Sequence, residues 1–214
     1  MNDYLQPGRF IDSAHPAVIA YAKEKATGKS ERERAVSLYY AVRDDIRYNP
    51  FQNFMLDDAY RGSVALRRGE GWCVPKAALL AACARVVGIP ARLGFADVRN
   101  HLTSPELTRK MGTDLFVFHG YTDLLLEGKW VKATPAFNLG LCTRFRVKPL
   151  EFDGTEDSIF HPFDEDNRKH MEYVNDRGNH ADVPVELIKR TFKETYPDYY
   201  HLGPDAAKES FAPA

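Results

Sequence analysis

The chain has few cysteines: three among 214 residues, at the widely spaced positions Cys73, Cys83 and Cys142. An odd number at this spacing argues against a disulfide framework and favours a reducing compartment. No uninterrupted apolar stretch reaches the roughly 18 residues that a membrane-spanning helix requires. The opening residues MNDYLQPGRF also lack the basic and apolar regions of a secretion signal. We therefore expect a cytoplasmic protein that does not insert into a membrane.

The sequence also lacks an excess of charge of either sign. It has 29 Lys and Arg against 30 Asp and Glu, a formal net charge of -1, and no block of like charge. This balance gives no electrostatic basis for binding nucleic acid or an anionic membrane. No internal repeat, low-complexity linker or change in composition marks a boundary. We therefore predict a single domain over residues 1–214.

Capping signals predict helices towards both ends of the chain. Ser13 precedes a helical stretch, and Ser30 with Glu33 forms a capping box ahead of a second one. Near the other end, Asp182 is a candidate cap for a helix that Pro197 would stop.

The stretch EGWCVPKAALLAACARVVGIP predicts a helix over residues 73–87. Pro75 has no N–H and fits only the first turn, while Gly88 and Pro90 prevent continuation. Only two residues of this helix are charged, so its faces are apolar almost all round. Such a helix is expected to be buried at the centre of the fold.

The pattern changes after this helix. Residues 91–98 and 115–137 are rich in aromatic and β-branched residues, and Glu127-Gly128 indicates a hairpin turn. Helices followed by strands predict an α+β fold with an antiparallel sheet.

Cys73 occupies the start of the predicted central helix. Unpaired backbone N–H groups and the helix dipole stabilise a thiolate there, which predicts a pKa below the ~8.5 of a free thiol. Cys83 would lie roughly 15 Å further along the axis, too far for a redox or metal pair. Cys142 is interpreted as a packing residue. The alternative for Cys73 is a small buried apolar residue, which most free cysteines are.

A nucleophilic cysteine needs a base, and His119 is the candidate. It lies in the apolar stretch FVFHGYTDL, next to Gly120, which leaves room for close approach of another backbone. A lone histidine in a strand is usually a hydrogen-bonded core residue. Here a cysteine at a helix start precedes it, which favours a working imidazole.

The order of four motifs resembles the transglutaminase-like superfamily of papain-like cysteine enzymes. The motifs are GWC at a helix start, GIPAR, a histidine in a strand, and W-V-x-x-x-P. The resemblance covers about residues 35–138, with 139–214 as a carboxy-terminal extension packed on this core. It implies a papain-like, transglutaminase-core fold in which the nucleophile helix packs on an antiparallel sheet. It also implies that Cys73 is the nucleophile, that His119 is the general base, and that Trp72 and Tyr121 belong to the oxyanion and substrate region.

The sequence departs from the family at the residue that orients the histidine. The family usually has W-V-x-x-D-P, whereas this chain has WVKATP, with Thr134 in the aspartate position. A threonine hydroxyl can fix the imidazole tautomer, but it does not stabilise an imidazolium as a carboxylate does. Asn138 is the alternative third member, because a hairpin centred on Gly128-Lys129 would place it opposite His119. Asp123 lies ~13 Å along the strand from His119, which is too far.

Two weaker signals accompany this constellation. Residues 98–112 form a polar stretch that could line the substrate cleft through Asn100 and His101. A second stretch contains four potential metal ligands, His161, Asp164, Asp166 and His170. No two of them have the sequence spacing typical of a pair of metal ligands, so we expect no metal and no cofactor.

Three functions remain open at this point. The first is a thiol enzyme that forms an acyl-enzyme from a peptide, protein or small amide and passes the acyl group to water or an amine. The second is a catalytically weakened or inactive binding module on the same scaffold, which Thr134 would permit. The third, a redox sensor, is disfavoured because no resolving cysteine lies nearby. The sequence does not indicate an oligomeric state.

Overall fold

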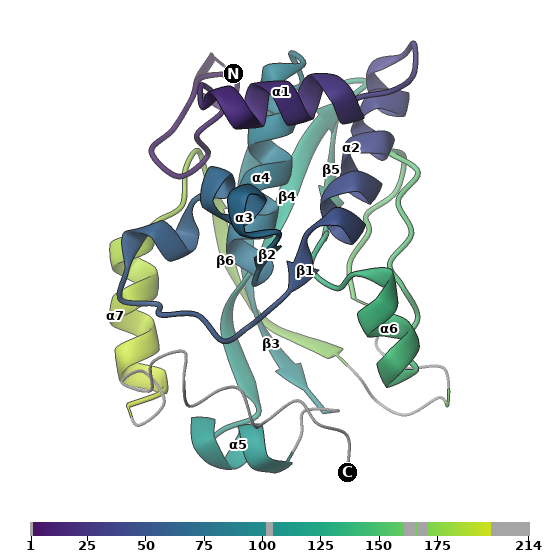
Figure 1. Ribbon diagram of the computed structural model, residues 1–214. Helices are drawn as coiled ribbons and strands as arrows, with labels where there is room; N and C mark the ends of the chain where they lie inside the picture. Colours follow the sequence, from purple (N-terminus) through teal and green to yellow (C-terminus); the bar gives the residue numbers. More distant parts are fainter. Residues whose placement is uncertain (1, 102–104, 161–165, 167–170, 198–214) are drawn as a thin grey trace.

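The computed structural model describes residues 2–101, 105–160, 166 and 171–197. A four-stranded sheet in the order β5-β4-β3-β6, antiparallel throughout, lies behind a layer of helices (Figure 1). A short parallel pair, β1-β2, lies apart from it. The strands are β1 Arg47–Tyr48, β2 Glu70–Gly71, β3 Ala91–Asn100, β4 Leu115–Leu126, β5 Lys129–Ala133 and β6 Met171–His180. The predicted α+β class is confirmed.

Seven α-helices are present among the described residues. They are α1 Pro16–Lys25, α2 Glu31–Asp45, α3 Gly62–Arg68, α4 Cys73–Val86, α5 Pro105–Met111, α6 Leu139–Phe145 and α7 Val185–Thr195. Two 3-10 turns, η1 Asn2–Tyr4 and η2 Asp57–Tyr60, complete the set in the described ranges. In Figure 1, α6 and α7 flank the sheet on opposite sides, and α4 runs through the middle of the molecule.

Helix α4 forms the centre of the fold, as predicted. It packs against α1, α2 and α3 and against strands β3 and β4, and its residues are buried from Cys73 to Arg85. Its two charged side chains are buried because main-chain carbonyls accept their hydrogen bonds. The Lys76 ammonium donates to the carbonyls of Arg43 and Ile46, which end α2. The Arg85 guanidinium donates to the carbonyl of Ala91 at 2.8 Å.

Local capping signals differ in their outcome. The Ser30–Glu33 capping box is confirmed at the start of α2. The helix expected after Ser13, with Pro16 in its first turn, is confirmed as α1; its N-cap is His15, whose imidazole accepts from the backbone of residue 17. The cap predicted at Asp182 is wrong. Its carboxylate instead accepts N–H groups from the amino-terminal segment, residues 9–11.

The β4–β5 hairpin is confirmed, but its predicted register is wrong. Leu126 pairs with Lys129, so that Glu127 and Gly128 form the whole turn. Both have positive φ, 51° and 83°, as a two-residue type I′ hairpin requires. Continuing this register beyond β5 places residue 136, and not Asn138, opposite His119.

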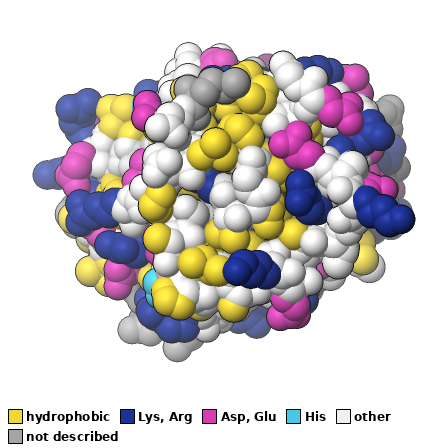
Figure 2. All heavy atoms as spheres, turned by 90° about the horizontal axis from the view of Figure 1, so that it is seen from above, with side chains coloured by type: hydrophobic (Ala, Val, Ile, Leu, Met, Phe, Trp, Pro, Cys, Tyr) yellow, Lys and Arg dark blue, Asp and Glu magenta, His cyan; other side chains and the backbone are white. Residues whose placement is uncertain are grey.

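The molecular surface agrees with the balanced composition. Figure 2, which looks down on the end of the molecule that carries α1, shows acidic and basic side chains interspersed with apolar ones. Among the helices in the described ranges, none combines the length and the apolar character needed to cross a membrane.

Candidate active site

Cys73 is the first residue of α4, and the segment before it is held in place by its backbone. The N–H groups of Arg47 and Asn49 donate to the carbonyls of Gly69 and Gly71 at 2.8 and 2.9 Å. The N-cap residue, Trp72, is extended and its side chain accepts no bond from the helix. The first N–H groups of α4 therefore have no side-chain cap and are available to a group at the helix start.

Strand β4 approaches this helix start at Gly120. A β-carbon on Gly120 would lie 3.2 Å from Val74 Cγ2 and 3.3 Å from Val74 Cα. The N–H of Gly120 acts on the Cys73 thiol, as do the N–H groups of Val74 and Cys73 itself, and all three lower its pKa. The sulfur therefore lies beside the backbone that follows His119. Donors in this arrangement could also stabilise an oxyanion.

The backbone is locally distorted at the residue before His119. Phe118 has a φ of 55°, which is uncommon for a large side chain, and the β3–β4 register shifts between Ala96 and Val98. The buried carboxylate of Asp97 accepts the Phe118 N–H at 3.1 Å and pairs with Arg177 at 2.8 Å. This bulge redirects the strand where the histidine projects. Asp97 was not predicted as a site residue, because its role depends on contacts distant in the chain.

Cys73 and His119 line one small cavity of about 80 Å³. Each is only 6% exposed. Phe160 covers the imidazole, with ring centroids 4.8 Å apart. Apart from the cysteine, the histidine and Asn100, the lining is apolar or aromatic. It includes Val98, Met111, Phe137, Met171, Phe192 and Tyr196.

Burial sets the protonation of both groups. It raises the pKa of the Cys73 thiol to about 12, although the three N–H groups oppose this, and it lowers the pKa of His119 to about 3. A charge in the cavity would lose its hydration, so each neutral form is favoured. The prediction of a lowered Cys73 pKa is therefore wrong. The resting pair is a thiol and a neutral imidazole.

The two candidates for orienting His119 make no hydrogen bond to it. Thr134 is 1% exposed, and neither its Oγ1 nor His119 Nε2 has a partner among the described residues. Asn138 instead precedes α6, and its carboxamide oxygen accepts the Tyr48 N–H at 3.1 Å. The rejected candidate, Asp123, binds Arg92 at 3.1 Å.

The predicted oxyanion-region residues lie in different places. Trp72 lines the cavity, and its indole N–H donates to the Ala59 carbonyl at 3.0 Å, so it is an anchored wall and not a free donor. Tyr121 does not line the cavity within the described residues. Its ring lies over Gly94, where an added β-carbon would stand 2.2 Å from it, and Lys132 is 5.2 Å from its centroid. The prediction for Tyr121 therefore lacks support.

The weaker sequence signals are resolved in part. Asn100 lines the cavity, whereas His101 is 3.2 Å from Glu172 and is not a lining residue. Of the four possible metal ligands, only Asp166 is described, and it pairs with Arg146 at 2.8 Å. The other three lie outside the described residues. Within the described ranges, no group of three or more His, Cys, Asp or Glu side chains could hold a metal.

Most of the apolar lining from the last third of the chain was not predicted. Phe160, Met171, Phe192 and Tyr196 all contact the site or its wall. The Tyr196 hydroxyl donates to the Leu115 carbonyl and accepts the Val117 N–H at 2.8 and 2.7 Å. The predicted helix after residue 182 was the one available signal, since its amphipathic pattern implies a buried face.

Comparison with known proteins adds two similarities. A family model described as the transglutaminase-like superfamily matches residues 19–135, more than half of the chain. "The Crystal Structure of a Putative Cysteine Protease from Cytophaga hutchinsonii" is similar over 83% of this chain and 53% of that chain, at 13% identity and a TM-score of 0.47. This chain thus spans about half the length of that structure. No curated protein matches the chain.

Proposed function

Because the chain belongs to the transglutaminase-like superfamily, we propose that it is a cysteine-dependent acyl-transfer enzyme that acts on amide bonds. Cys73 is the nucleophile and His119 the general base. The observation that carries this proposal is that both line one small cavity, where three backbone N–H groups act to lower the pKa of the Cys73 thiol. A peptide, a protein or a small amide would supply the acyl group.

The reaction begins from the neutral pair. As the sulfur attacks the carbonyl carbon, the thiol proton passes to the imidazole, and the carbonyl oxygen gains the negative charge. The N–H groups at the helix start and at Gly120 are the candidate donors to that oxygen. The imidazolium then protonates the leaving amine as the C–N bond breaks, which leaves a thioester on Cys73. Water or a second amine attacks the thioester, and the proton returns to the sulfur.

Burial makes the proton transfer demanding. The transfer creates an ion pair in a cavity that favours both neutral forms. A substrate that opens the cavity, or an oxyanion that compensates the imidazolium, would reduce this cost. We expect acylation by small activated esters, which do not displace the aromatic lining, to be slow but measurable over hours.

A binding module on the same scaffold is the second candidate function. It is favoured by one observation: His119 Nε2 has no partner among the described residues, so no described hydrogen bond at that nitrogen orients the imidazole for proton transfer. In this alternative the cavity holds a ligand without turnover.

Acylation by p-nitrophenyl acetate, followed by intact-protein mass spectrometry, tests the proposal. We expect one acetyl group on the native protein, none at this site in Cys73→Ala, and slower acetylation in His119→Gln. Cys83→Ala is the matched control, because Cys83 lies in the same helix, is fully buried and lies outside the cavity. Acetylation that is equal in native and His119→Gln protein, or absent from Cys73, would favour the binding module.

A further inference from the structure

A broad groove lies beside the Cys73 cavity. Its volume is about 890 Å³, near the upper end of the roughly 300–1,000 Å³ typical of ligand sites. Tyr48 and Pro50 line both the groove and the cavity, so these two residues form the wall between them. A ligand along the groove would therefore end at the wall of the cavity that holds Cys73.

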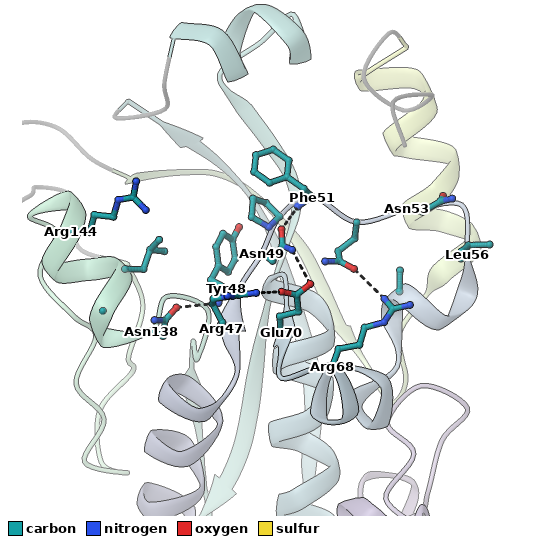
Figure 3. Close-up of a pocket in the computed structure, with 15 residues that line it drawn as sticks. Arg47, Tyr48, Asn49, Phe51, Asn53, Leu56, Arg68, Glu70, Asn138 and Arg144 are labelled. Atoms are coloured by element: carbon teal, nitrogen blue, oxygen red, sulfur yellow. Dashed lines mark hydrogen bonds and ion pairs between the residues drawn. The ribbon is translucent and has the colours of Figure 1, made fainter. Parts of the chain in front are cut away.

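The groove is cationic. Its lining contains Arg47, Arg68 and Arg144 and a single acidic residue, Glu70. Figure 3 shows Arg68 and Arg144 on opposite sides of the groove, with the Arg47–Glu70 pair between them. Arg47 and Glu70 are 2.5 Å apart and offset each other, whereas the described contact of Arg68 is the neutral carboxamide of Gln52 at 3.2 Å. The groove thus has an excess of positive charge in a protein whose net charge is -1.

The amide side chains of the groove add hydrogen-bond donors. The oxygen of Asn53 accepts the Met55 N–H at 3.0 Å, and the oxygen of Asn138 accepts the Tyr48 N–H at 3.1 Å. Among the described residues, the amide nitrogens of these two side chains have no acceptor. Donor groups and arginines together favour a ligand that carries carboxylates.

Exposed apolar side chains occur in the segments that line the groove. Six large apolar residues are strongly exposed in the described ranges, and four of them are groove residues or their immediate neighbours in sequence. These four are Met55, Leu56, Leu139 and Phe145, which are 38–54% exposed. Apolar contacts around a polar, cationic groove suit a polypeptide better than a simple anion.

We propose that this groove binds an acidic, extended peptide segment of the substrate, next to the amide bond that enters the Cys73 cavity. The inference rests on the proposed function, because it assigns the groove to the acyl donor. Carboxylates of the segment pair with Arg68, whose described contact is with a neutral carboxamide. Its apolar residues contact Leu56 and Leu141, which line the groove, and its main chain accepts from the amide side chains.

Peptide binding to Cys73→Ala protein tests this without requiring turnover. The probes are fluorescently labelled peptides of alternating glutamate and leucine, or of glutamine and leucine, measured by anisotropy. We expect the glutamate peptide to bind more tightly, and its affinity to fall as salt is added. In the Cys73→Ala protein, the additional change Arg68→Glu should lower the affinity for the glutamate peptide about three- to tenfold. Arg68→Lys keeps the charge and should leave that affinity within about twofold of the value for Cys73→Ala alone.

Arg67→Glu is the matched control. Arg67 is the exposed neighbour of Arg68 in α3, and it does not line the groove. It should change the affinity less than about twofold, because only long-range charge is altered. The proposal would be overturned if the two peptides bound equally tightly, or if the Arg67 and Arg68 variants lost the same affinity. It would also be overturned if free glutamate competed for the groove as well as the unlabelled glutamate peptide does. Charge-selective binding without acetylation of Cys73 would instead reject the enzyme and retain the groove.

Discussion

Gly120 of strand β4 lies against Val74 at the start of α4, with space for a β-carbon only 3.2 Å from the Val74 side chain. Gly120→Ala should push the strand away from the helix start. We expect a loss of about 1–3 kcal/mol in the free energy of unfolding, as for other overpacked core sites, and slower acetylation of Cys73. Urea unfolding and mass spectrometry measure the two effects. The matched control, Gly140→Ala in exposed α6, meets nothing nearer than 3.6 Å and should be neutral or stabilising. An unchanged Gly120→Ala protein would mean that the strand and helix do not meet this closely.

The pH dependence of Cys73 alkylation tests the neutral resting pair. With a pKa of about 12, the thiolate fraction should rise about tenfold per pH unit from pH 7 to 10, without a plateau. A variant without Cys83 and Cys142 isolates the signal. Alkylation by iodoacetamide, followed by mass, should be slower than that of a free thiol at neutral pH. A plateau below pH 8.5 would reveal a stable thiolate–imidazolium pair and contradict the effect of burial.

Acid stability reports on the buried imidazole. Burial lowers the pKa of His119 from 6.5 to about 3, so between these values the unfolded chain binds a proton that the folded protein does not. Stability should therefore fall as the pH decreases through this window. Between pH 6.5 and 5, the native protein should lose about 1.5–2 kcal/mol more than His119→Gln. Urea unfolding at the two pH values measures this. A slope in His119→Gln equal to that of the native protein would contradict the burial of this imidazole.

Asp97 holds the backbone beside the imidazole. Asp97→Ala removes the acceptor of the Phe118 N–H and the partner of Arg177. We expect a loss of about 2–4 kcal/mol in stability and a marked fall in the acetylation rate, because Phe118 can then leave its left-handed conformation. Arg177→Ala keeps the Asp97 acceptor and should impair acetylation much less. Equal acetylation rates in the two variants would show that the bulge does not position His119.

The parts of the fold that were predicted correctly rest on local signals. Pro75, Gly88 and Pro90 delimit α4 because each restricts the backbone at its own position. The Ser30–Glu33 box is likewise contained within one helical turn. The hairpin was predicted, but not its register, since that depends on which residues adopt positive φ in the turn.

The environment of the site could not be predicted in the same way. The position of Cys73 at a helix start was correct, but its burial comes from distant segments such as α7, with Phe192 and Tyr196. The carboxylate of Asp182 binds the amino-terminal segment instead of a helix end. Both depend on contacts between residues more than 100 positions apart, for which a single sequence gives no pairing signal.

Thr134 occupies the position in which the family usually has an aspartate. Thr134 follows β5, and the hairpin register places it opposite Tyr121, two residues from His119. Its hydroxyl and His119 Nε2 are both buried without partners among the described residues. Thr134→Val should therefore keep the acetylation rate within about twofold and leave stability equal or slightly higher, because no made hydrogen bond is lost.

Thr134→Asp should raise the acetylation rate and lower the stability of the protein. A carboxylate near the imidazole stabilises the imidazolium, so we expect acetylation of Cys73 to rise about tenfold or more. The same carboxylate is buried, and should cost about 2–4 kcal/mol of stability.

Asn138→Ala, which removes the acceptor of the Tyr48 N–H, should lower stability by about 1 kcal/mol and leave the acetylation rate unchanged. Acetylation and urea unfolding of the three variants separate these cases. A rate that falls in Thr134→Val would give the hydroxyl an orienting role, and one that falls only in Asn138→Ala would transfer that role to Asn138. If Thr134→Asp leaves the rate unchanged, His119 does not become an imidazolium during the reaction, and the binding module gains support.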